Sequence, residues 1–278
     1  TARFANLILR NFKGGVQLKN STLMLKDLST KTNVGDLKLN AMYHCNDKNG
    51  ADAGIDVQGS NVDITNLVNT MPEIDSLVPM LRSFQGVVTV DLTAKTSLDS
   101  VYNLLLPSLS AATVIRGDSL VLMDGETFSE VAKLLMFKKK TKNLIDNISV
   151  ELLLNNNEMQ VLPFMVEMDK YKVAVGGQNS LDMNFNYHVS VLKSPLPTKL
   201  GVNVSGTLDD MKIRLAKCKY KDEKTVTRKG QFSNGGVNLR SELQNNLRAA
   251  IRNAVNSYAT EQKERMSAVT EEKKKKQE

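Results

Sequence analysis

LDMNFNYHVSV, residues 181–191, alternates apolar and polar side chains at every position. Its six apolar residues fall on one side of an extended chain, and Asp182, His188 and the other polar residues fall on the opposite side. Successive side chains of a β-strand point to opposite faces, so this period of two is typical of a strand with one buried and one solvated face. Such half-buried strands belong to antiparallel sheets. We therefore predict a long antiparallel strand here.

The same alternation recurs along most of the chain. It is clear in the segments 37–43, 88–94, 148–154, 162–168, 171–175, 200–204 and 213–215. The connections at 155–157, 176–179 and 207–210 are short and carry Gly, Asn or Asp, which supply positive φ or an Asx turn. Strands joined by short turns are neighbours in a meander. The sequence therefore predicts a mainly β domain of meandering antiparallel hairpins over residues 1–216.

Helical patterns are few and lie where the alternation stops. Residues 127–130 (TFSE) form a capping box ahead of an apolar stripe, which predicts a short helix. From 235 to 260 the apolar residues recur at spacings of three and four, which predicts a C-terminal amphipathic helix. The polar, turn-rich residues 217–234 are predicted as a linker, and 261–278 as a disordered charged tail.

Length, charge and composition limit the class of protein. The 278 residues are 41% hydrophobic, which is enough for a sizeable core, and no run of 18 apolar residues is present. The net charge of +7 is a mild basic bias, but Trp is absent and aromatic residues make up 5%. The stacking platforms of a single-strand nucleic-acid binder are therefore poorly supplied, and basic clusters suit anionic lipid headgroups equally well. We expect no nucleic-acid partner.

The first residues and the cysteines bear on the compartment. The sequence begins at Thr1 and opens directly on a strand pattern, so we expect any signal or membrane anchor to lie upstream. Cys45 and Cys218 are too few for a disulfide framework and lack a CxxC spacing. One bridge and two buried thiols both fit this pair, and two buried thiols are favoured.

Residues with catalytic or metal-binding chemistry are sparse. His44 and His188 are the two histidines, which leaves little imidazole to activate a Ser or Cys nucleophile. His44 and Cys45 are adjacent on a predicted strand and point to opposite faces, which argues against one metal ion between them. The motifs GxxxxGKS/T, GxGxxG, HExxH and GxSxG are absent. We expect ordinary surface or packed histidines, no enzyme activity and no cofactor.

Three segments between residues 111 and 215, taken in order, carry a family resemblance. The first is RGDSLVL at 116–122, followed by a turn and by LLMF at 134–137. The second is a hairpin series from IDNI at 145–148 through VLPF at 161–164 to LDMNF at 181–185, and the third is LGVNVSGTL at 200–208. Together they resemble the C-terminal region of the AsmA family, large envelope proteins of Gram-negative bacteria.

The resemblance implies a long curved antiparallel sheet or groove, lined by apolar residues, in a periplasmic body tethered to the inner membrane by a segment absent from this chain. It also implies a role in outer-membrane assembly and biogenesis through phospholipid binding or transport. The side chains expected to face lipid are Phe164, Val166, Met168, Leu181, Met183 and Phe185. The alternation alone leaves open whether this apolar face is a closed core or an open groove.

The alternative hypothesis is a structural periplasmic scaffold. In this case the C-terminal helix exposes one apolar stripe that docks on another envelope protein or on a second copy of the chain. The stripe residues predicted for this contact are Leu243, Leu247 and Ile251.

Overall fold

The computed structural model describes residues 2–4, 6–19, 21–46, 50–72, 74, 79–101, 103–122, 126–135, 143–168, 170–182, 184–195, 199–207, 209–226, 241–243, 245–247 and 249. These residues are mainly β with few short helices, so the predicted fold class is confirmed. The predicted tail at 261–278 lies outside them.

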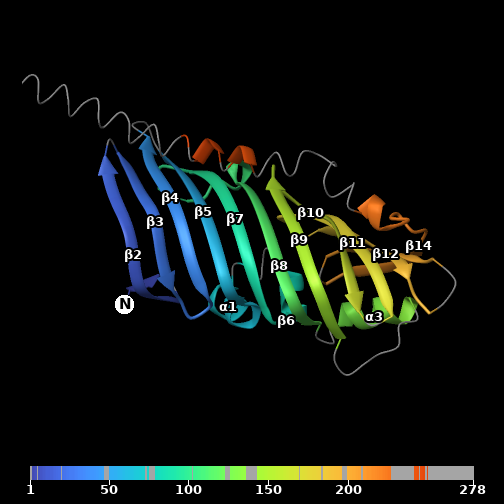
Figure 1. Cartoon of the computed structure of the whole chain (residues 1–278). Coiled ribbons are helices and arrows are strands. Elements are labelled where there is room, and N and C mark those ends of the chain that lie inside the picture. The colour runs from blue at the N-terminus through green and yellow to red at the C-terminus, as the bar shows by residue number, and fades with distance from the viewer. Residues whose placement is uncertain are drawn as a thin grey trace, which may run out of the picture.

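Fourteen strands form one sheet. They are β1 (Ala2–Phe4), β2 (Leu7–Lys19), β3 (Thr22–Lys31), β4 (Asp36–Asn46), β5 (Gly50–Asp63), β6 (Phe84–Gln85), β7 (Val87–Leu98), β8 (Ser110–Leu122), β9 (Asn143–Asn155), β10 (Glu158–Met168), β11 (Tyr171–Ser180), β12 (Phe185–Lys193), β13 (Gly201–Gly206) and β14 (Met211–Ala216). Consecutive strands pair antiparallel from β1 to β14, except that β5 pairs with β7 and the short β6 pairs with β8. Figure 1 shows this meander as an open, curved sheet that runs from β2 at one side to β14 at the other.

The stretch 181–191 forms a shorter strand than the alternation predicts. Leu181 and Asp182 lie in a turn, and β12 begins at Phe185. The register pairs Phe185 with Asn179, so the residues between them must reverse the chain, and the backbone N–H of Ser180 donates to the carbonyl of Asn184 at 2.9 Å. The prediction of strand at Leu181 and Asp182 is therefore wrong. The apolar and polar residues keep alternating through the turn, and only the pairing of β11 with β12 determines where the turn lies.

Short helical segments interrupt the meander, and those with described bounds are α1 (Ile64–Thr70), the 3-10 helices η1 (Pro79–Ser83) and η2 (Leu106–Ser108), and α3 (Glu126–Leu134). Asp63 caps α1, since its side chain accepts from the Asn66 backbone N–H at 2.8 Å. α3 begins at Glu126, ahead of Thr127, so the predicted capping box lies inside the helix. α1 and α3 follow strands at the same end of the sheet (Figure 1).

Register defines two faces of the sheet, because residues directly opposite each other in an antiparallel pair lie on the same side. Leu39, Val57 and Leu92 face one another across β4, β5 and β7, and we call their side the apolar face. Lys38 lies opposite Gln58 on the other side, the polar face. In β3 an extra residue, Asp27 at φ 48°, forms a bulge that returns the apolar alternation to the same face.

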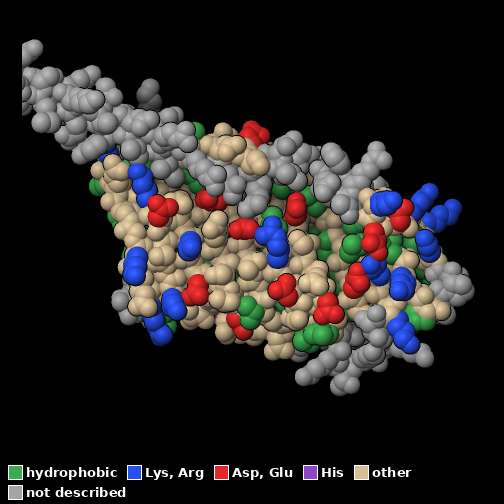
Figure 2. Space-filling model, viewed as in Figure 1, with side chains coloured by type: hydrophobic (Ala, Val, Ile, Leu, Met, Phe, Trp, Pro, Cys, Tyr) green, Lys and Arg blue, Asp and Glu red, His purple; other side chains and the backbone are tan. Residues whose placement is uncertain are grey.

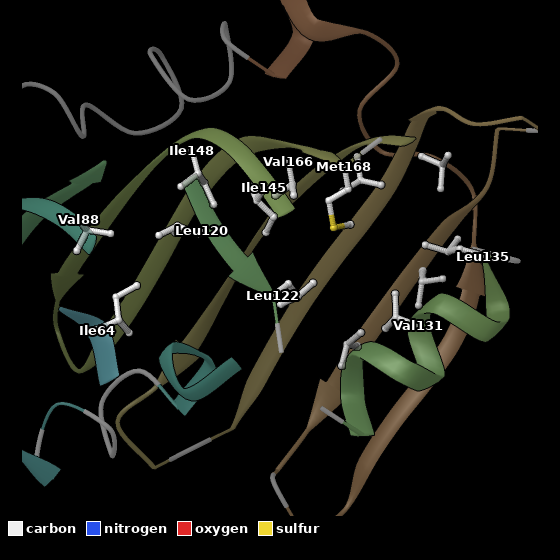
Figure 3. Close-up of a cluster of buried hydrophobic side chains, with 14 of the residues drawn as sticks. Ile64, Val88, Leu120, Leu122, Val131, Leu135, Ile145, Ile148, Val166 and Met168 are labelled. Carbon is white, nitrogen blue, oxygen red and sulfur yellow. The ribbon is translucent and has the colours of Figure 1, made fainter. Parts of the chain in front are cut away.

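The main hydrophobic core lies on the apolar face of the C-terminal half of the sheet. Buried side chains from strands between β5 and β13 join residues of α1 and α3 in one cluster. Figure 3 shows Ile145, Met168 and Val131 of α3 within this cluster. α3 therefore covers part of the apolar face of the curved sheet.

Candidate functional site

The apolar face continues beyond the core, across the N-terminal strands, as two rows of side chains in register. The first row contains Val16, Leu25, Ala41, Ile55, Ala94, Ala111 and Leu154, one from each of seven neighbouring strands. The second row contains Leu28, Leu39, Val57, Leu92, Thr113 and Leu152. We call the two rows together the apolar ladder. The rows run across the strands, so one apolar surface extends from β2 to β9.

Exposure of the first row falls from the N-terminal edge of the sheet toward the core. Val16 on β2 is 62% exposed and Ile55 on β5 is 37% exposed, whereas Leu154 on β9 is 9% exposed. Leu18, which lies beside the first row on β2, is 76% exposed. Single exposed apolar residues are ordinary, but a contiguous exposed apolar patch marks an interaction site. The first row is therefore open to solvent at Val16 and Ile55 and closed where it meets the core, whereas Leu28 of the second row is 3% exposed.

The residues predicted to face lipid lie in the closed part of the apolar face. Val166 and Met168 are buried in the core cluster, and Phe164 and Phe185 pack against it as partly buried side chains. Leu181 is half-buried in the turn before β12. Met183 lies outside the described residues. The prediction of an open surface is wrong for Val166 and Met168, because α3 and the curved sheet cover them.

The C-terminal residues predicted to dock a partner pack on the chain itself. Leu243 is buried in a small cluster with Ala112, Leu153 and Leu162, on the polar side of the sheet. Leu247 is also buried, and a Cβ added to Gly54 would lie 2.8 Å from its Cδ1 atom, so a strand glycine makes room for it. Ile251 lies outside the described residues. The prediction that Leu243 and Leu247 are exposed is therefore wrong, because the polar face has apolar patches that receive them.

Part of the predicted linker is also packed. Tyr220 and Val226 are buried against Ala174, and Met165 and Leu192 pack around them. Lys172 reaches Glu223 and Glu167 at 2.5 Å each, and these side-chain hydrogen bonds, first from Glu167, raise the pKa of Lys172. Residues 217–226 are therefore part of the sheet domain, and the remainder of the predicted linker lies outside the described residues.

A buried polar cluster fastens this segment to the polar face. The backbone N–H of Lys219 donates to Nε2 of His188 at 3.1 Å and to Oγ of Ser190 at 3.0 Å. Since Nε2 accepts, the ring proton lies on Nδ1, which donates to Oδ1 of Asn203 at 2.6 Å. The Tyr220 ring packs edge-on against His188 at 5.9 Å between centroids. His188 is thus a buried structural residue.

Ser190, His188 and Asn203 place a hydroxyl, an imidazole and an amide in series, in the order that nucleophilic hydrolases use. Ser190 Oγ lies 2.8 Å from Nε2 of His188. Its side chain is 0% exposed, however, and it accepts backbone N–H groups from both Lys219 and Tyr220. A nucleophile needs access to its substrate, so this arrangement serves packing rather than catalysis.

Tyr187 gives the sheet a testable response to alkali. Burial raises the pKa of its phenol to about 12 from 10.0, and the hydroxyl donates to Oδ1 of Asn179 at 2.7 Å. A pKa raised by folding contributes stability that is complete below about pH 10 and is lost as the pH rises through about 12. We expect urea unfolding to show a loss of about 2 kcal/mol over this range.

The Tyr187→Phe variant should lack that alkaline loss, because Phe has no phenolic proton to release. The measurement is the free energy of unfolding of both proteins at several pH values between about 8 and 12. Parallel loss of stability in the two proteins would show that Tyr187 does not cause it.

Other candidate chemistry is limited in the part of the chain described here. Cys45 and Cys218 are both free and half-buried, and His44 exchanges a 2.8 Å hydrogen bond with the Thr22 hydroxyl on the neighbouring strand. The described residues contain no group of three His, Cys, Asp or Glu placed to hold a metal ion. Among them there is also no helix with the length and apolar character needed to cross a bilayer.

The fold and this surface define a mainly β protein with one open, curved antiparallel sheet whose apolar face is partly exposed. Comparison of the chain with models of protein families, with curated proteins and with solved structures finds no match.

Proposed function

We propose that the protein is a non-enzymatic lipid-binding module, in which the open part of the apolar ladder binds the acyl chains of phospholipid. The exposure of Val16 and Ile55 in one continuous row is the observation that carries this proposal. A surface of this kind has a large unfavourable hydration free energy, which acyl chains relieve by covering it. The bound lipid therefore takes the place that a second layer of protein fills over the core.

The dimensions of the ladder suit a lipid. Neighbouring strands lie about 4.8 Å apart, so the four strands β2–β5 at the open end of the first row span about 14 Å. One acyl chain is about 15 Å long, taken as half the thickness of a bilayer's hydrocarbon core. The open end of the row is therefore about as long as one acyl chain lying across the strands. A ligand held only by apolar contacts also moves along such a row without breaking hydrogen bonds, which suits a conduit.

The cellular role that we propose follows the resemblance to the AsmA family. It is a periplasmic module, tethered to the inner membrane by a segment absent from this chain, that binds or conducts phospholipid during outer-membrane biogenesis. The resemblance rests on residues 111–215, whereas the open ladder lies mostly before them. The surface geometry and the resemblance therefore support the proposal independently.

Site-specific photo-crosslinking tests the binding surface. A photoreactive residue at Ile55 on the apolar face should crosslink to phospholipid when the purified chain is incubated with vesicles, and mass spectrometry identifies the adduct. The matched control is the same residue at Gln58, which is exposed on the polar face of the same strand. Absence of lipid adducts at Ile55, or equal yields at both positions, would refute the proposal.

A further inference from the structure

The polar face of β2, β3 and β4 carries a cluster of cations. Register places Arg10 opposite Lys31, and Ser29 lies opposite both Lys13 and Lys38. Lys26 lies opposite Gly15 on the same side. The β-bulges at Asn11, Gly14 and Asp27 keep these cations on one face while the alternation shifts by one residue. We call Arg10, Lys13, Lys26, Lys31 and Lys38 the basic patch.

The basic patch has more cations than neighbouring carboxylates, although Asp36 lies directly opposite Lys31 in the register of β3 and β4. The strands β2–β4 contain six Lys or Arg and two Asp, whereas β5, β7, β8 and β9 contain two Lys or Arg and seven Asp or Glu. The ion pairs of Arg116, Lys172 and Lys212 all lie outside the patch. Figure 2 shows Lys and Arg side chains, with acidic side chains among them, over the β2–β4 end of this face.

The same strands expose apolar side chains on their other face. Phe12 is 50% exposed on β2, the strand that also carries the exposed Val16 and Leu18. Beyond Leu9, where the pairing with β1 ends, β2 is the edge of the sheet, and it exposes these three apolar residues in addition to the charges and bulges that usually protect an edge strand. A nucleic acid or an acidic protein segment matches the cations but gives these apolar residues no partner. An anionic bilayer offers both phosphate groups and, just below them, an apolar phase.

We propose that the β2–β4 end of the sheet docks on an anionic phospholipid membrane, with the basic patch on the headgroups and the apolar edge of β2 at the boundary of the acyl chains. This inference goes beyond lipid binding by the ladder, since docking needs only the cations and the edge strand. It also gives the open end of the ladder its orientation: the exposed end meets the membrane and the closed end points away from it.

Vesicle flotation tests the docking. The purified chain should bind vesicles of phosphatidylcholine with about one-third phosphatidylglycerol and float poorly with pure phosphatidylcholine. Each Lys near an anionic surface contributes about a fivefold gain in affinity, so Lys13→Gln/Lys26→Gln/Lys38→Gln should weaken binding about 100-fold. Binding of the wild type should also fall steeply as the salt concentration rises, because salt screens the electrostatic attraction between the patch and the anionic headgroups.

The matched control removes the same charge from other exposed lysines. Lys95, Lys193 and Lys221 lie outside β2–β4, and Lys95→Gln/Lys193→Gln/Lys221→Gln should bind anionic vesicles nearly as well as the wild type. Equal losses of vesicle binding in both variants would show that net charge alone drives the binding, and this result would overturn the proposal. Equal binding of the wild type to neutral and anionic vesicles would also overturn it, as would tighter binding of an RNA oligonucleotide that the patch variant loses.

A second readout separates docking from ligand binding. Short-chain phospholipid in free solution needs no membrane docking, so the patch variant should still crosslink to it through a photoreactive residue at Ile55. Loss of vesicle binding with retained crosslinking supports the docking surface. Absence of crosslinking in both proteins, with vesicle binding intact in the wild type, refutes the lipid-binding ladder and leaves the docking surface standing.

Discussion

Replacing Ile55 by aspartate is expected to abolish phospholipid binding by the apolar ladder while leaving the sheet folded. Ile55 lies in the middle of the first row, between Ala41 and Ala94, and is 37% exposed. In the free protein the carboxylate reaches water, so the cost is mainly that of an acidic residue in a strand, about 1 kcal/mol. With acyl chains over the row the charge loses its hydration, which costs several kcal/mol. Affinity should fall more than about 100-fold.

The lipid recovered with the purified protein measures this effect, with quantification by mass spectrometry after solvent extraction. Gln58→Asp introduces the same charge three residues away on the polar face, where Gln58 is exposed. That variant should retain lipid at the level of the wild type. Retention of lipid by Ile55→Asp, with cooperative unfolding unchanged, would mean that the lipid binds elsewhere on the protein and would refute the ladder as its binding site.

The strands and their two faces were predictable because polar side chains alternate with apolar ones along most strands. Alternation at 37–43 and 88–94 marks residues such as Leu39 and Leu92, and these lie on the same face with Val57 of β5 directly between them. The pairing of strands in chain order also follows from short turns. Bulges are harder to predict, because Asp27 in the left-handed region shifts the pattern by one residue without leaving a distinct sequence signal.

Which part of the apolar face is covered could not be predicted from alternation. Val166 and Ile55 both lie on alternating strands, yet the first is buried and the second is partly exposed. The difference comes from α3 and from the curvature of the sheet, which are tertiary features. The same holds for Leu243: its helical spacing predicts an apolar stripe, but only the fold supplies Ala112, Leu153 and Leu162 on the polar side to bury it.

Two isoleucines on the same sheet allow the closed core and the open ladder to be compared, because the same Ile→Ala substitution can be made in each. Ile145 on β9 is 1% exposed within the core cluster, whereas Ile55 on β5 is 37% exposed (Figure 3 shows Ile145). Ile145→Ala removes buried methyl groups and leaves a cavity between β9 and its neighbours, which should cost about 3–4 kcal/mol in the free energy of unfolding. Ile55→Ala leaves no closed cavity, because solvent reaches the site.

The expected cost of Ile55→Ala is therefore about 1 kcal/mol, from the loss of partly buried methyl and methylene groups alone. Urea unfolding of both variants in lipid-free buffer measures the difference, and equal slopes confirm that both lose the same folded state. Adding phospholipid should stabilise the wild type and Ile145→Ala by similar amounts, since a ligand that binds only the folded state raises its stability. It should stabilise Ile55→Ala less, because that variant offers the lipid a smaller apolar surface. Equal costs for the two substitutions in lipid-free buffer would mean that Ile55 is covered by protein in solution, and the open ladder would then have to be abandoned.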